Sequence, residues 1–418
     1  MGKRSDSFGK SRQHFTLKGK RAEQLIQELA ERTFLTDWCY ANPRLPDGKE
    51  LCDLLVVFDS TAIIWQIKDL EVDKQGAFRA SDLEKNLRQL SGARRQLFDL
   101  KTKVELSNPR RGTETLDATK IKDFHLISVI LGPSDLVASH PMRFIEEIKG
   151  HPAHVFVLNF TELILNELDT VSDFCKYLRA LESIAWETRM VLNGGEQELL
   201  AHYLAKGRSF QWLDPTKVNF VHDGAWETLE KSKGYIQWKQ DNEVSYFWDQ
   251  LIDMAHEGSR EEPQYEKVAR ELARSNRFDR RLLAKTFIEG HEKAHCERRN
   301  NVYRRVFDFE GLTYCFVYMH DPVKPEVRRS LLGHTCFVAR GKFPTNTKVV
   351  GAATEMKLDI GHTFDFCLLQ KDNWTADDQR RVSEIQDKFG ILVNPQMKAF
   401  DEEEYTTLLR FSRGKPSS

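Results

Sequence analysis

The sequence lacks the long apolar runs that mark membrane-spanning segments. No stretch approaches the roughly 20 uninterrupted apolar residues that a membrane helix needs, and the mean hydropathy of the chain is −0.53. The first 21 residues hold seven lysines and arginines against one acid, without the apolar stretch of a secretory signal. These absences predict a cytoplasmic protein.

Cysteine is sparse and charge is balanced. The seven cysteines are scattered, and no two form the C-x-x-C pair typical of zinc and redox sites. We therefore expect idle or buried thiols rather than a disulfide framework. The formal net charge of −1 gives no global attraction to nucleic acid, so any attraction is local. No phosphate-binding G-x-x-x-x-G-K-[ST] loop occurs, and ATP or GTP hydrolysis is not expected.

The length of 418 residues predicts two or three domains. A basic N-terminal arm at 1–18 is either solvated or in contact with phosphates. An α/β domain is expected at 19–165, a helical region at 166–300, and an α+β domain at 301–418.

Hydrophobic periodicity predicts the elements of these parts. Helices are expected at 20–34, 81–103 and near 375–389. A loop is expected at 105–121. Strands are expected at 51–58, 62–68, 124–131 and 154–160, and in TYCFVYM, HTCFVAR, KVVGAA and FDFCLLQ beyond residue 301. The N-terminal pattern indicates a mixed sheet flanked by helices.

Polar side chains interrupt two of the apolar strands. Asp53 lies in the first, and Gln66 and Lys68 lie two apart in the second, on one face of the sheet. A buried carboxylate costs several kcal/mol unless something offsets it. If Asp59-Ser60 is a two-residue hairpin turn, Asp53 lies directly opposite Gln66.

This arrangement fits a magnesium site. Phosphodiester hydrolysis needs a divalent cation, oxygen ligands to hold it, and a cation or base beside the attacking water. Asp53 and Gln66 supply oxygens, and Lys68 supplies the charge. The alternative is a core ion pair between Asp53 and Lys68, with Gln66 as a satisfied amide.

Three motifs follow one another in this part of the chain: G-x-x-A-E, E-x-x-D and Q-x-K. Their residues are Gly19, Ala22, Glu23, Glu50, Asp53, Gln66 and Lys68. Over about residues 19–131 the pattern resembles the PD-(D/E)XK nuclease superfamily, and within it the Mrr-type restriction endonucleases and nuclease-related domains. The run RQLSGARRQL at 88–97 resembles that group's downstream helix.

The resemblance implies a restriction-endonuclease-like fold and a metal-dependent endonuclease. It implies that Glu23 assists metal or water binding, that Asp53 and Gln66 bind Mg²⁺ or Mn²⁺, and that Lys68 acts on the nucleophile. Glu50 and Asp69, which flank the motif, are either further ligands or solvated charges.

The expected substrate is nucleic acid, DNA rather than RNA, in prokaryotic restriction or anti-phage defence. A homo-oligomer or a partner protein of a defence system fits that setting. The alternative function is a nucleic-acid-binding or regulatory protein that keeps the nuclease fold without cleaving.

Two further patterns compete with this interpretation. His291 and His295 form a literal H-E-x-x-H, but their neighbours are polar all round, which favours a partly exposed helix without zinc. The segment 270–285 is rich in arginine, and an exposed helix face is expected there, with a nucleic-acid contact as the alternative.

Overall fold

The computed structural model describes residues 23–70, 80–131, 145–185, 188–296, 302–309, 311–320, 323–355 and 363–396, with Glu402 and Glu404. The chain forms two compact units. Unit 1 comprises 1–236 with 408–418, and unit 2 comprises 237–407. The basic arm expected at 1–18 lies outside the described residues. The expected divisions near 165 and 300 remain predictions.

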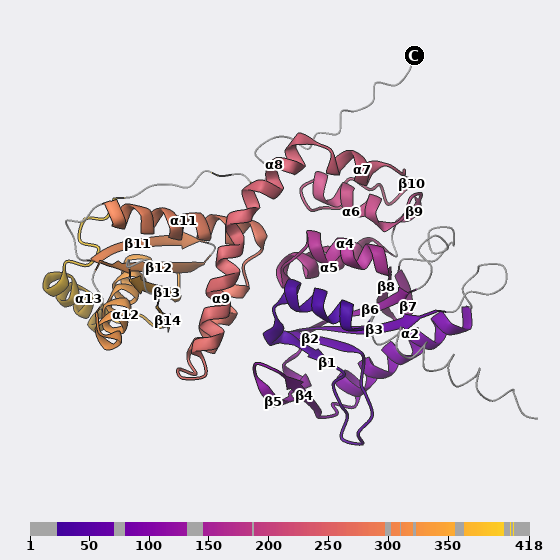
Figure 1. Ribbon diagram of the computed structural model, residues 1–418, viewed down its shortest axis with the longest axis horizontal. Helices are drawn as coiled ribbons and strands as arrows, with labels where there is room; N and C mark the ends of the chain where they lie inside the picture. The colour runs from indigo at the N-terminus through magenta and orange to yellow at the C-terminus, as the bar shows by residue number, and fades with distance from the viewer. Residues whose placement is uncertain are drawn as a thin grey trace, which may run out of the picture. The chain divides into compact units, whose positions relative to one another are not determined.

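Unit 1 is built around a six-stranded mixed sheet (Figure 1). Across the sheet the strands are β1 (Cys39–Ala41), β2 (Leu54–Phe58), β3 (Thr61–Asp69), β6 (Asp123–Leu131), β8 (His151–Val157) and β7 (Ile145–Ile148). The first three are antiparallel, β6 and β8 run parallel to β3, and β7 is antiparallel to β8. The expected α/β class with a mixed sheet is confirmed.

Helices cover both faces of this sheet (Figure 1). On one face, Leu90 and Ala93 of α2 (Ala80–Arg94) share a buried cluster with Ile64 of β3. On the other face lie α4 (Leu158–Glu167) and α5 (Val171–Ala185). There Trp65 of β3 stacks on Phe174 of α5 with ring centroids 5.8 Å apart.

The first helix covers the same face as α5. Residues 23–34 are helical, in agreement with the expected helix at 20–34 as far as the chain is described. Its buried side chains Ile26, Ala30 and Phe34 recur at four-residue steps. Phe34 contacts Trp65 at 6.4 Å between ring centroids. This packing holds the end of the helix against the sheet.

The loop expected at 105–121 is wrong. The segment forms an antiparallel hairpin of β4 (Val104–Asn108) and β5 (Gly112–Leu116). Buried and exposed side chains alternate along β4, which is the period of a half-buried strand. A strand this short, beside a turn rich in polar residues, gives only a weak sequence signal.

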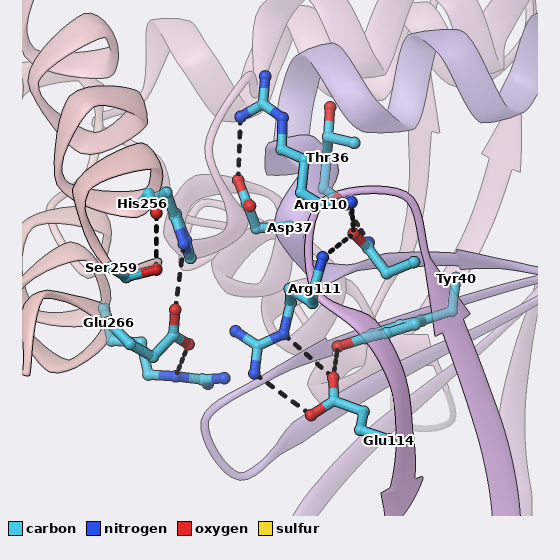
Figure 2. Close-up of polar contacts among 11 residues, drawn as sticks. Thr36, Asp37, Tyr40, Arg110, Arg111, Glu114, His256, Ser259 and Glu266 are labelled. Carbon is cyan, nitrogen blue, oxygen red and sulfur yellow. Dashed lines mark hydrogen bonds and ion pairs between the residues drawn. The ribbon is translucent and has the colours of Figure 1, made fainter. Parts of the chain in front are cut away.

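Polar contacts fix this hairpin against β1 (Figure 2). The Arg110 guanidinium pairs with Asp37 at 3.2 Å. The carboxylate of Glu114 accepts from Arg111 at 3.1 Å and from the hydroxyl of Tyr40. The hairpin therefore has an ionic anchor in addition to its apolar face.

Several expected boundaries also need correction. The strand expected at 51–58 begins at Leu54, and the helix expected at 81–103 ends in a π-helical turn at Arg95–Asp99. The strand expected at 154–160 ends at Val157, where α4 begins. The run HTCFVAR lies in a helix, not a strand. Short buried apolar runs do not distinguish strand from helix by periodicity alone, which explains the last two errors.

The rest of unit 1 is mainly helical. It comprises β9 (Arg189–Leu192), α6 (Glu196–Ala205), β10 (Val218–Val221), α7 (Ala225–Glu230) and α8 (Lys233–Asn242), the last of which continues into unit 2. The two short strands pair in parallel.

Unit 2 contains a four-stranded sheet with helices on both faces (Figure 1). Its elements are α9 (Tyr246–Gly258), α10 (Tyr265–Ala273), α11 (Arg277–Cys296), β11 (Val302–Phe309), β12 (Leu312–Met319), α12 (Pro325–Lys342), β13 (Lys348–Glu355), β14 (Phe364–Gln370) and α13 (Ala376–Phe389). Cys336 of α12 packs so closely on β13 that a Cβ at Gly351 would lie 2.6 Å from its sulfur. The glycine therefore permits this close packing.

The exposed arginine face expected at 270–285 is wrong. Arg277, Arg280 and Arg281 are buried. The carboxylate of Asp249 pairs with Arg277 at 2.9 Å and with Arg280 at 2.6 Å, and Arg281 pairs with Glu402 at 3.2 Å. Buried partners supply the charge compensation that solvent was expected to give.

No helix among the described residues is long and apolar enough to cross a membrane. All seven cysteines are free, and five of them are buried.

Candidate active site

Asp53 lies at the entrance to the β2–β3 hairpin. The ladder pairs Phe58 with Thr61 and ends with Leu54 opposite Trp65, which confirms the expected two-residue turn. The backbone N–H of Asp53 donates to the Trp65 carbonyl at 3.2 Å, so the regular register stops at Leu54. The expected backbone pair of Asp53 with Gln66 is not part of the ladder.

The Asp53 carboxylate contacts the next strand directly. Its Oδ2 accepts a hydrogen bond from Gln66 Nε2 at 2.6 Å and another from the backbone N–H of Ile67. Gln66 itself is buried. The two side chains therefore meet across the hairpin.

The electrostatic environment of Asp53 is acidic. Burial raises the pKa of Asp53, the Ile67 N–H lowers it, and the carboxylates of Glu23 and Glu50 raise it further, giving about 7. None of these strongest influences is a basic group. Glu23 comes from the first helix and Glu50 from the loop before β2, so the carboxylates that act on Asp53 belong to two other segments.

A cavity of about 270 Å³ opens beside these groups. Asp53, Gln66 and Glu50 line one side of it. The opposite wall comes from α2 and the π-helical turn after it, through Gln89, Gly92, Ala93, Arg95 and Gln96. The cavity therefore combines oxygen ligands on one side with polar and cationic groups on the other.

Lys68 follows Gln66 on the same face of β3, one step further along the strand. It is half-buried, and within the described part of the chain it forms no ion pair with Asp53. Of the alternative, the described contacts lack the Asp53–Lys68 ion pair but include the satisfied Gln66 amide. Asp69 ends β3 half-buried, and Glu50 is exposed at the cavity rim.

The α2 wall of the cavity contributes residues beyond the predicted site. Gln89, Arg95 and Gln96 belong to the run RQLSGARRQL, but none of them is an expected site residue. That run was the available signal, since its polar residues interrupt a leucine-rich stripe at the face that meets the hairpin.

The H-E-x-x-H histidines lie on α11, as expected for a partly exposed helix. His291 is half-buried and its ring contacts Tyr318 at 5.9 Å between centroids, whereas His295 is exposed. That neither binds zinc remains a prediction.

Comparisons with models of protein families, with curated proteins and with solved structures find no significant match for this chain.

Proposed function

We propose that this chain is a metal-dependent endonuclease of the PD-(D/E)XK type. The observation that carries the proposal is that Asp53 and Gln66, joined by a 2.6 Å hydrogen bond across the hairpin, line one cavity together with Glu50. Burial raises the pKa of Asp53, and a bound cation would offset the cost of holding its carboxylate ionised.

The donor set fits magnesium. Carboxylate oxygens of Asp53, Glu50 and Glu23, with the amide oxygen of Gln66, are the hard ligands that Mg²⁺ and Mn²⁺ prefer. When bound, such an ion activates a water molecule and neutralises charge on the phosphate. Gln66 stands where most of the superfamily has Asp or Glu, so the site has one negative charge fewer. We therefore expect metal affinity to depend more on Glu23 and Glu50.

Two basic side chains, Lys68 and Arg95, are suited to contact the phosphate groups of the substrate. Lys68 is not engaged by Asp53, so its ammonium group is available to orient the water or to stabilise charge that develops at phosphorus. Arg95 is exposed at the cavity rim, where a guanidinium can contact a neighbouring phosphate.

DNA is the first candidate substrate and RNA the second, in a restriction or anti-phage setting, with a homo-oligomer or a defence-system protein as the further partner. This part of the proposal rests on the motif resemblance alone. A nucleic-acid-binding protein without cleavage is the second candidate, and the available Lys68 beside an acidic cluster favours the enzyme.

The test is incubation of the full-length chain with plasmid DNA and with structured RNA, in Mg²⁺, in Mn²⁺ and in chelator. We expect metal-dependent cleavage by the wild type. Lys68→Ala should lose about a hundred- to thousandfold in rate, the typical cost of one well-placed electrostatic group. Its melting temperature should stay unchanged, because Lys68 forms no ion pair with Asp53 in the part of the chain that the structure describes.

Lys122→Ala is the matched control, because Lys122 is an exposed lysine before β6 in the same sheet. It should cleave like the wild type. Binding of nucleic acid without cleavage in either metal would favour the non-cleaving alternative, and equal rates for Lys68→Ala and wild type would remove Lys68 from the mechanism.

A further inference from the structure

Two histidines and a glutamate converge on the face of the unit 1 sheet that α5 covers. His125 lies on β6, His154 on the neighbouring β8, and Glu182 on α5. His125 Nδ1 and His154 Nε2 approach the same glutamate oxygen, Oε1, at 2.8 and 3.0 Å. The three donor atoms lie within 4.8 Å of one another.

This cluster is separate from the Asp53 site. His154 pairs with Ile127, and Ile127 pairs with Trp65, so the three share one face. Trp65 packs on α5, whereas Gln66, the next residue, points to the opposite face. The two groups of potential ligands are thus on opposite sides of the sheet.

We infer that His125, His154 and Glu182 bind a divalent transition metal, with zinc the preferred ion. Imidazole nitrogens with a carboxylate oxygen form a donor set that zinc accepts. Bonds of about 2.0–2.2 Å put tetrahedral ligand atoms about 3.3 Å apart. The two nitrogen–oxygen separations, 2.8 and 3.0 Å, would widen by only a few tenths of an ångström. Both histidine side chains are fully buried, which fits a structural rather than a catalytic ion.

The second ring nitrogen of each histidine is buried and has no hydrogen-bond partner among the described residues. His125 Nε2 lies 3.7 Å from the Asp123 carboxylate, too far for a hydrogen bond, and Arg179 pairs with that carboxylate at 2.5 Å. Cys175, two turns before Glu182 on α5, is buried beside His125 and is a candidate fourth ligand.

Zinc has to compete with a proton at this cluster. Burial lowers the pKa of His125, but Cys175 and Glu182 outweigh it and raise the pKa to about 9. Burial lowers the pKa of His154, which keeps that imidazole in the neutral form that binds metals.

The experiment uses the full-length chain, stripped with chelator, desalted and titrated with Zn²⁺ against a competing indicator. The variant is His154→Gln. His256→Gln is the matched control, because His256 is also buried and pairs with a carboxylate, Glu266, at 3.0 Å (Figure 2), without belonging to a described metal-ligating group. Asp53→Asn reports on binding at the other site.

We expect one tightly held zinc in wild type, His256→Gln and Asp53→Asn, and at least about 100-fold weaker binding in His154→Gln. X-ray absorption at the zinc edge of the wild type should show imidazole ligands, a readout that survives misfolding of the variant. An imidazole-free spectrum, absence of zinc binding by the wild type, or zinc lost in Asp53→Asn and kept in His154→Gln would overturn the inference.

Discussion

A carboxylate as buried as that of Asp53 usually has a basic partner. Around Asp53 the strongest influences are instead burial, a backbone N–H and two further carboxylates. In the absence of a cation, part of this charge is relieved by a proton. Ionised Asp53 therefore lowers the stability of the folded protein, and a bound metal ion would offset this destabilisation.

This cost predicts a pH-dependent effect of Asp53→Asn. The folded-state pKa of about 7 lies above the ordinary value of 3.8, so the folded state holds an extra proton between these values. Its stabilising contribution is present below pH 4 and is lost as the pH rises through 7. Asparagine does not ionise, so the variant avoids this loss of stability at high pH. Its amide oxygen can still accept a hydrogen bond from the Ile67 N–H.

In chelator at pH 8, we expect the free energy of unfolding of Asp53→Asn to exceed that of the wild type by about 1–3 kcal/mol. The difference should vanish near pH 4. Denaturant unfolding at both pH values measures it. A variant no more stable than wild type at pH 8 would show that the Asp53 charge is already compensated.

At the scale of elements, α2 forms the wall of the cavity that faces the hairpin. Gly92 of this helix has no side chain and lines the cavity. A Cβ atom added at Gly92 would meet no atom within 4 Å. The open space in front of Gly92 is therefore continuous with the cavity.

Two substitutions at Gly92 should separate stability from access. Gly92→Ala should stabilise the protein by about 0.5–1 kcal/mol through helix propensity. Gly92→Met should keep Mn²⁺ binding but lower the cleavage rate, because its side chain occupies the cavity. Gly333→Met on α12 is the control, since Gly333 is also a helical glycine with open space around its Cβ position. Equal cleavage by both methionine variants would place the substrate elsewhere.

The elements that sequence could predict are those with a strong periodic pattern. The β2–β3 hairpin has long apolar strands and a short turn, so its register followed from counting residues. The β4–β5 hairpin is held by the ion pair of Arg110 with Asp37 and by the hydrogen bond from Tyr40 to Glu114, which join residues far apart in sequence, and no local pattern shows such contacts.

The same limit applies to the sites. Asp53, Gln66 and Lys68 are close in sequence and interrupt apolar strands, so their shared face was predictable. His125, His154 and Glu182 are brought together only by strand order and by the packing of α5, neither of which their spacing shows.

At the scale of the whole molecule, the chain forms two compact units with separate cores. The buried arginines belong entirely to unit 2, where the carboxylate of Asp249 accepts two of them. Loss of that carboxylate would leave two guanidinium groups buried without their ionic partner, a change expected to destabilise unit 2 alone.

Asp249→Ala should cost about 3–5 kcal/mol, the usual result of breaking a buried charge pair from one side. Hydrogen exchange should show lost protection in α9 and α11 and unchanged protection in β3 and β6. Glu257→Ala, an exposed position on α9, is the control. Equal loss of protection in both sheets would mean that the units unfold as one cooperative body.

The central claim is that Asp53 and Gln66 hold a divalent cation, and calorimetric titration of Mn²⁺ into the full-length chain tests it most directly. We expect the wild type to bind Mn²⁺ and Asp53→Asn to bind at least about tenfold more weakly, a loss of about 1.4 kcal/mol. Gln66→Glu should bind as tightly as the wild type or more tightly, because it adds a second carboxylate beside Asp53. Equal Mn²⁺ affinity in wild type and Asp53→Asn would contradict the metal site and, with it, the nuclease.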